Sequence, residues 1–138
     1  MNAFTSGFKA LSDLTRMRAL RMILAAEQQV CVCELADALE LPQYQVSKHL
    51  AILRQVGLVT DSRLGTWVYY STPSEVSGFI AGLYRLVSEQ VAGPIFSSDA
   101  ERLKARLELR EEGRCVLGPN RCAAATDTPK GSQRRRRQ

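Results

Sequence analysis

The residues of this 138-residue chain best suited to chemistry are its four cysteines. Cys31 and Cys33 are two positions apart, and Cys115 and Cys122 lie near the C-terminus. The N-terminus has neither a basic start nor an apolar run, so we expect no secretory signal and a cytoplasmic protein. Thiols stay reduced there, which favours metal ligands or sensor thiols over structural disulfides. Burial as small hydrophobes is the alternative for the first pair.

The spacing of the first pair restricts how it could hold one ion. Residues at i and i+2 of a regular helix do not face each other, so Cys31 and Cys33 could not chelate one atom from an intact helix. In an extended segment they point the same way. We therefore expect ion binding to favour an unwound first turn and to shift this helix.

The second pair lies among loop-forming residues, Gly113, Gly118 and Pro119. This composition argues against core burial of Cys115 and Cys122. Arg114 and Arg121 adjoin the two thiols and are expected to lower their pKa, which favours reactive or ligand thiolates.

The sequence does not favour an enzyme or a membrane protein. The sole histidine, His49, lies in a polar helix, and no nucleophile with a base and an orienting group can be assembled, so an enzyme is not expected. No stretch is apolar enough to span a bilayer, so no membrane partner is expected, and the length suits one domain.

The net charge of +5 is concentrated at the C-terminus. Residues 114–138 carry seven Lys or Arg against one acidic residue, a net +6, and Arg134–Arg137 stand in a row. Such a run is typical of a solvated tail that touches phosphates without reading sequence. Recognition of a particular DNA sequence would therefore depend on other elements.

Residues 30–58 contain two short helical patterns separated by a break at residues 40–43. A proline in the break ends the first helix, and Gly57 follows the second at a position suited to positive φ. Such a pair is either ordinary helix packing or a helix-turn-helix, whose second helix lies in the major groove of DNA. The apolar positions are Leu35, Ala36 and Leu39 in the first helix and Val46, Leu50 and Leu53 in the second.

The second helix carries polar side chains away from its apolar stripe. Glutamine can bond adenine edges, serine can bond bases or phosphates, and lysine can meet guanine or phosphate. The candidate DNA-binding residues are Gln43, Tyr44, Gln45, Ser47, Lys48 and His49.

After Gly57 the pattern changes to two-residue alternation. Residues 58–63 and 66–71 predict two strands joined by a tight turn at Leu64-Gly65. A hairpin alone would be structural, but directly after a recognition helix it is typical of a wing. Arg63, near its tip, could then reach phosphates or a minor groove.

Amphipathic helices are predicted on both sides of this unit. The first contains Phe4, Phe8 and Leu11. Ser12 is a natural N-cap for the second. The inward positions of that second helix are Leu14, Met17, Leu20 and Leu24.

Beyond the hairpin, Thr72 and Glu75 match a capping box for a helix from Pro73 to Val91. The apolar stripe of this helix exceeds what so small a domain can bury, which favours a homodimer interface over packing within one chain. A second capping box, at Ser98 and Glu101, predicts a charged helix to about Glu112.

Several segments together resemble the ArsR/SmtB family of metalloregulatory repressors: residues 8–16, 30–35, 46–50 with Leu53, 57–59 and 67–70. The resemblance covers residues 4 to about 95. It implies a mainly α winged helix-turn-helix homodimer with a small β-hairpin, which represses an operon and releases double-stranded operator DNA on binding a toxic metal ion or metalloid. It also implies a dimer interface built from the first helix and the helix from Pro73 to Val91.

The Cys-Val-Cys pair resembles the arsenic- and cadmium-sensing branches of that family. The arsenic branch often has a further cysteine where this chain has Ala36, so a third sulfur would come from Cys115 or Cys122, of the same or the partner chain. We slightly favour Cys115, which is nearer the preceding helix and so less costly to order. The expected inducer is arsenite, As(III), with Cd(II) or Pb(II) as alternatives for a four-thiolate site. A thiol-oxidation sensor on the same fold is a further alternative.

The chain is thus expected to have three parts. Residues 1–96 form a winged-helix DNA-binding and dimerisation domain, residues 97–113 a C-terminal helix, and residues 114–138 a cysteine-bearing loop with a basic tail.

Overall fold

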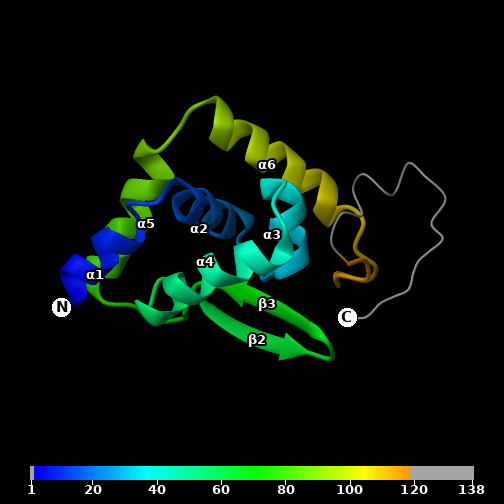
Figure 1. Cartoon of the computed structure of the whole chain (residues 1–138), viewed down its shortest axis with the longest axis horizontal. Coiled ribbons are helices and arrows are strands. Elements are labelled where there is room, and N and C mark those ends of the chain that lie inside the picture. The colour runs from blue at the N-terminus through cyan, green and yellow to red at the C-terminus, as the bar shows by residue number, and fades with distance from the viewer. Residues whose placement is uncertain (1, 119–138) are drawn as a thin grey trace.

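The computed structural model describes residues 2–118 as six α-helices and one three-stranded antiparallel sheet (Figure 1). This confirms the predicted winged helix-turn-helix. The helices are α1 (Ala3–Ala10), α2 (Leu14–Ala26), α3 (Val32–Leu39), α4 (Gln43–Gln55), α5 (Gly78–Gln90) and α6 (Pro94–Leu107). The strands are β1 (Val30–Cys31), β2 (Thr60–Leu64) and β3 (Trp67–Ser71).

The core forms around α2, which packs against α3, α4, α5 and α6. The apolar stripe predicted on α4 is fully buried, because Val46, Leu50 and Leu53 all face this core. Leu14, predicted to face inward, is instead 54% exposed at the start of α2.

The helix-turn-helix is formed by α3 and α4 as the sequence predicts. Glu40 ends α3 in the left-handed conformation, and Pro42 is the N-cap of α4. Gly57 follows α4 with a φ of 86°, a value that costs glycine little and other residues more. Residues of α3 and α4 pack directly on one another.

The wing is the hairpin of β2 and β3. Leu64 pairs with Trp67, so the turn is at Gly65-Thr66, one residue later than predicted. Leu58 and Val59, assigned to the first strand from sequence, are buried before that strand begins. Alternation alone does not distinguish a strand from an extended segment that enters the core.

The sheet has a third strand that the sequence pattern did not predict. The sheet order is β1-β3-β2, and Val30 and Cys31 pair with Tyr70 and Tyr69. A strand of two residues is too short to show a period, and the apolar residues of this segment were assigned to a helix.

Three of the predicted helix starts were wrong. Asp13, not Ser12, caps α2 by accepting the Arg16 N–H at 3.0 Å. Ser77 caps α5, so the helix begins five residues after Pro73. Pro94 opens α6 ahead of Ser98, since its missing N–H is not needed in a first turn. In each case a second residue able to start a helix stood near the predicted one.

The end of α6 was also predicted too late. The helix ends at Leu107, and residues 111–114 form a tight turn in which Gly113 has a φ of 76°. This turn directs the chain back toward α3.

Helix α1 lies beside α5 (Figure 1). Apolar side chains of both helices remain exposed there. Phe4 and Phe8 contact Phe79 of α5 edge-to-face, with ring centroids 5.0 and 5.4 Å away. Phe4 and Phe8 are nevertheless 58% and 57% exposed, and Leu86 on α5 is 50% exposed.

Candidate functional site

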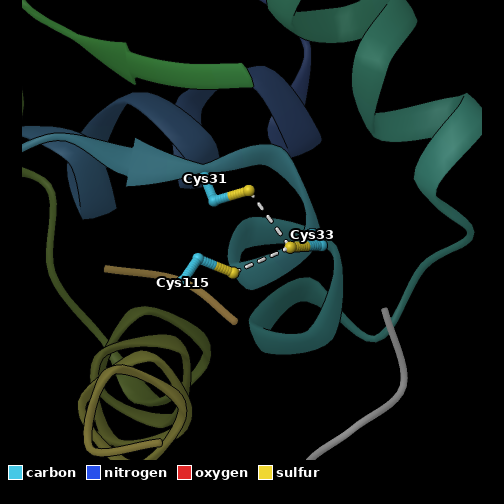
Figure 2. Close-up of side chains that lie close together, drawn as sticks. All are labelled: Cys31, Cys33 and Cys115. Carbon is cyan, nitrogen blue, oxygen red and sulfur yellow. Dashed lines mark hydrogen bonds between the residues drawn. The ribbon is translucent and has the colours of Figure 1, made fainter. Parts of the chain in front are cut away.

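Cys31, Cys33 and Cys115 lie together in the core, although more than eighty residues separate Cys115 from the other two in sequence. Sγ of Cys33 is 3.1 Å from Sγ of Cys31 and 3.3 Å from Sγ of Cys115. Figure 2 shows the Cys33 sulfur between the other two. The three sulfurs lie within 4.8 Å of one another. Cys122 lies outside the described residues.

The first two thiols meet without any loss of helix. Cys31 ends β1 and is the N-cap of α3, with extended φ and ψ of −72° and 147°. Only Cys33 is helical, so its side chain can lie beside that of Cys31. The placement of both residues inside the helix was therefore wrong, and the effect of a bound ion on the first turn stays a prediction.

The third thiol is held by the segment after α6. The Cys115 N–H donates to Tyr69 Oη at 3.0 Å, and its Sγ lies 3.3 Å from the Leu117 carbonyl oxygen. Cys115 is buried, contrary to the prediction from its loop composition. The glycine-containing turn before it carries the segment into the core rather than into solvent.

The thiols differ in their readiness to ionise. Hydrogen bonds from Cys115 and Cys33 lower the pKa of Cys31, whose position at the start of α3 also favours a thiolate. The hydrogen bond with Cys31 raises the pKa of Cys115, and those with Cys115 and Cys31 raise the pKa of Cys33. The predicted lowering of the Cys115 pKa by Arg114 was wrong, because Arg114 is exposed.

This set of donors suits a soft, thiophilic ion. Three sulfurs converge, and thiolates select soft ions over hard ones such as Mg²⁺. Trivalent arsenic takes three thiolates. The three sulfurs among the described residues could therefore hold one soft ion that takes three thiolates.

The candidate DNA-binding residues divide by exposure along α4. Tyr44 is 68% exposed, and the Lys48 ammonium lies 5.9 Å from its ring centroid. Gln43, Gln45 and Ser47 are half-buried along the same helix.

His49 does not share this surface. Its Nδ1 lies 3.2 Å from Arg16 Nη1 and 3.9 Å from Asp13 Oδ1, so the ring faces the start of α2. His49 is partly buried, as are Gln43, Gln45 and Ser47, and its contact with DNA stays a prediction.

The wing presents Arg63 as the sequence predicts. Arg63 is exposed on β2, opposite Val68. Arg54 of α4 bonds Asp61 of β2 at 2.8 Å, which ties the wing to the second helix of the helix-turn-helix.

Comparison with known proteins agrees with this arrangement. Residues 13–61 match the model of the bacterial regulatory proteins of the arsR family. The chain is also 40% identical over 116 residues to the arsenic resistance transcriptional regulator ArsR1 of Pseudomonas putida, with 84% of each chain covered. The chain belongs to the arsR family.

Two further likenesses extend the comparison. The arsenical resistance operon repressor of Escherichia coli is 38% identical over 74 residues, which cover 54% of this chain and 62% of that one. The structure of reduced HlyU from Vibrio cholerae matches with a TM-score of 0.56 and 28% identity, covering 66% of this chain and 90% of that one.

Membership of the arsR family makes the chain a transcriptional regulator with a DNA-binding helix-turn-helix. It also confirms that the chain is not an enzyme. Within residues 2–118, no helix is both long and apolar enough to cross a membrane.

The matched family segment contains Cys31 and Cys33 but ends well before Arg106, Arg110 and Cys115. The sequence analysis did not predict the ion pairs that join α3 to the chain around Cys115. Arg110, which follows the end of α6, forms a two-pronged ion pair with Glu34 of α3 at 2.7 and 2.8 Å, and Glu34 also accepts the Cys31 N–H at 2.8 Å. Arg106 of α6 bonds Asp37 of α3 at 2.7 Å.

The signal for these pairs was present in the sequence. Arg102, Arg106 and Arg110 recur every four residues along α6 and its continuation, and Glu34, Asp37 and Glu40 recur every three along α3. Both spacings give one face of a helix. Opposite charges on two such faces indicate that the helices pack together, but the pairing itself appears only in the fold.

Proposed function

We propose that this arsR-family protein is a transcriptional repressor that releases its operator when arsenite binds Cys31, Cys33 and Cys115. The observation that carries the proposal is the convergence of three buried thiols from β1, α3 and the segment after α6. In the reaction, the three hydroxyl groups of arsenous acid would leave as water, with protons from the thiols and from solvent, and three cysteine sulfurs would take their places on arsenic. Names of the relatives above support arsenic as the signal.

Operator binding is assigned to α4 and the wing. Gln43, Tyr44, Gln45, Ser47 and Lys48 would contact the major groove or its phosphates, and Arg63 the adjacent backbone. A dimer would present two copies of α4 to two half-sites. The exposed apolar surface of α1 and α5 supports a homodimer through that surface.

The thiols are joined to the DNA-binding unit through α3. Cys31 caps this helix, Cys33 is in its first turn, and α4 packs against it. Arsenite would bias the pose of α3 by linking it to the Cys115 segment. A ligand shifts such an equilibrium only by the difference in its affinity for the two states. Operator DNA must therefore weaken arsenite binding by the same factor by which arsenite weakens DNA binding.

The decisive experiment follows operator binding by fluorescence anisotropy during arsenite titration. Cys31→Ser, Cys33→Ser and Cys115→Ser should each bind operator like the parent and fail to release it, since serine is a poor ligand for a soft ion. Cys122→Ser is the matched control and should respond like the parent. If the Cys115→Ser protein released operator DNA like the parent, Cys115 would not be a ligand of arsenite.

Cd(II) and Pb(II) are alternative inducers because they too prefer thiolates. Thiol oxidation is a second candidate, favoured by the sulfur–sulfur distances of 3.1 and 3.3 Å. A peroxide would take the hydrogens of two thiols, forming a disulfide and two waters. Operator release by stoichiometric peroxide, with no release by arsenite, would favour a repressor that senses thiol oxidation.

A further inference from the structure

Arg106 is a fully buried cation beside the three thiols. Its Nε donates to Asp37 Oδ2 at 2.7 Å on α3. Its Nη2 donates to the carbonyl oxygens of Leu117 and Gly118 at 2.6 and 2.9 Å, and lies 3.8 Å from Cys33 Sγ. One guanidinium thus joins α6, α3 and the segment that carries Cys115.

The chain segment that carries Cys115 is held next to the other two thiols by its hydrogen bonds with Arg106. The Leu117 carbonyl oxygen, which Arg106 holds, also lies 3.3 Å from Cys115 Sγ and 3.4 Å from Cys33 Sγ. A guanidinium is a rigid fork whose nitrogens can serve a carboxylate on one side and carbonyls on another. A lysine ammonium at this position could keep the ion pair with Asp37 but could not span both sets of acceptors.

We propose that Arg106 is a positioning residue that holds the Cys115 segment on the Cys31–Cys33 pair before any ion binds. The proposal rests on the function proposed above, in which the three thiols bind arsenite together. Without Arg106 the segment would have to be ordered during binding, and the entropy of that ordering would reduce affinity.

Arg102 provides a matched control. It lies one turn earlier on α6 and also contacts α3, donating to the Ala38 carbonyl oxygen at 2.6 Å. Its other hydrogen bond in the described part of the chain goes to Asp99 of α6 at 2.8 Å. Arg102 therefore shares the helix, the charge and the neighbour of Arg106, but not its hold on residues 117 and 118.

The test uses the full-length, metal-free protein and measures the alkylation rate of each cysteine by iodoacetamide, read by mass spectrometry. In Arg106→Lys the rate at Cys115 should rise by about tenfold or more relative to Cys31, because losing hydrogen bonds from a charged donor opens the segment. Arg102→Lys should leave Cys115 as protected as in the parent. The paired variant Asp37→Asn/Arg106→Gln, which removes both charges of this ion pair, should behave like Arg106→Lys.

Arsenite affinity provides the second readout. Residues that orient metal ligands typically contribute about 10–100-fold to affinity, so Arg106→Lys should weaken arsenite binding by that factor and Arg102→Lys should not. Equal protection of Cys115 in Arg106→Lys and Arg102→Lys would overturn the proposal. So would an equal rise at all cysteines, Cys31 included, since that would mark a general structural role.

The two proposals fail in different ways. If the parent protein does not bind arsenite, the proposed function is wrong, but Cys115 protection in the metal-free protein still reports on Arg106. If arsenite binds and Arg106→Lys leaves Cys115 protected, only the role of Arg106 is wrong.

Discussion

At the scale of single residues, the protonation of the three thiols decides how each inducer would depend on pH. Cys31 is the thiol most readily ionised, and the pKa values of Cys33 and Cys115 are raised. From these directions we expect one thiolate and two protonated thiols in the site near neutral pH. Arsenous acid needs three protons to leave as three waters, so its binding would take up one proton. Cd(II) carries no hydroxyl groups to protonate, so its binding would release two.

We therefore expect arsenite and Cd(II) to show opposite pH dependence between about pH 6 and pH 8. Uptake of a proton means that arsenite affinity falls as pH rises, by up to about tenfold per pH unit. Release of two protons means that Cd(II) affinity rises, by up to about a hundredfold per unit. Calorimetric titrations at three pH values would measure both slopes. A rise of arsenite affinity with pH would contradict the assignment of protons to Cys33 and Cys115.

At the scale of elements, the contact between α3 and the chain from α6 to Arg110 is a series of ion pairs. Glu34 is fully buried, and it joins the Cys31 N–H to the guanidinium of Arg110. Burial removes the hydration of both charged groups, and this loss offsets most of their attraction. An intact buried pair therefore contributes little net stability. Its removal on one side alone is costly, since it leaves an unpaired buried charge. The three thiols and the first helix of the helix-turn-helix therefore share one electrostatic support.

Glu34→Gln should lower the free energy of unfolding by about 3 kcal/mol, because Arg110 would lose its carboxylate in a buried setting. Asp61→Asn is the control: it breaks the solvent-accessible pair with Arg54, and exposed pairs contribute about 0–1 kcal/mol. Urea denaturation followed by circular dichroism would compare the two. A Glu34→Gln protein as stable as Asp61→Asn would show that the ion pair with Arg110 does not support the fold.

At the scale of the whole molecule, the surface of α1 and α5 is the strongest candidate for contact with a second copy. Phe79, Leu83 and Leu86 repeat at i, i+4 and i+7 on α5, so they lie on one stripe beside Phe4 and Phe8. Leu83 is buried within the chain, whereas Leu86 is half exposed. Exposed apolar side chains that adjoin one another typically mark an interface.

Leu86→Glu should prevent the proposed dimer from forming, since it would place a charge in an apolar interface. Leu64→Glu, at an exposed leucine on β2 of the wing, is the control and should leave the oligomeric state unchanged. Sedimentation velocity would measure both. The Leu86→Glu protein should also lose operator affinity, because two linked half-site contacts become independent ones. If the Leu86→Glu protein were still a dimer, the interface would not include this face of α5.

Local patterns in the sequence determined the helix-turn-helix, the wing and the first cysteine pair. Val46, Leu50 and Leu53 repeat at helical spacing, and Gly57 can adopt the positive φ that follows α4. These features depend on neighbours within one or two turns, so composition and spacing reveal them. Helix starts were less well determined, because Ser12 and Asp13 could both cap α2 and only one did.

Tertiary structure alone decided the third thiol. Cys115 reaches Cys33 because α6 packs along α3, the Gly113 turn reverses the chain, and Tyr69 receives its N–H. Burial of Cys115 and the role of Arg106 follow from the same contacts. No short-range pattern encodes such contacts, since they depend on which charged faces meet when distant segments pack. The sequence by itself therefore indicated which residue types could bind a soft ion, and the packing of α6 on α3 selected Cys115 among the described residues.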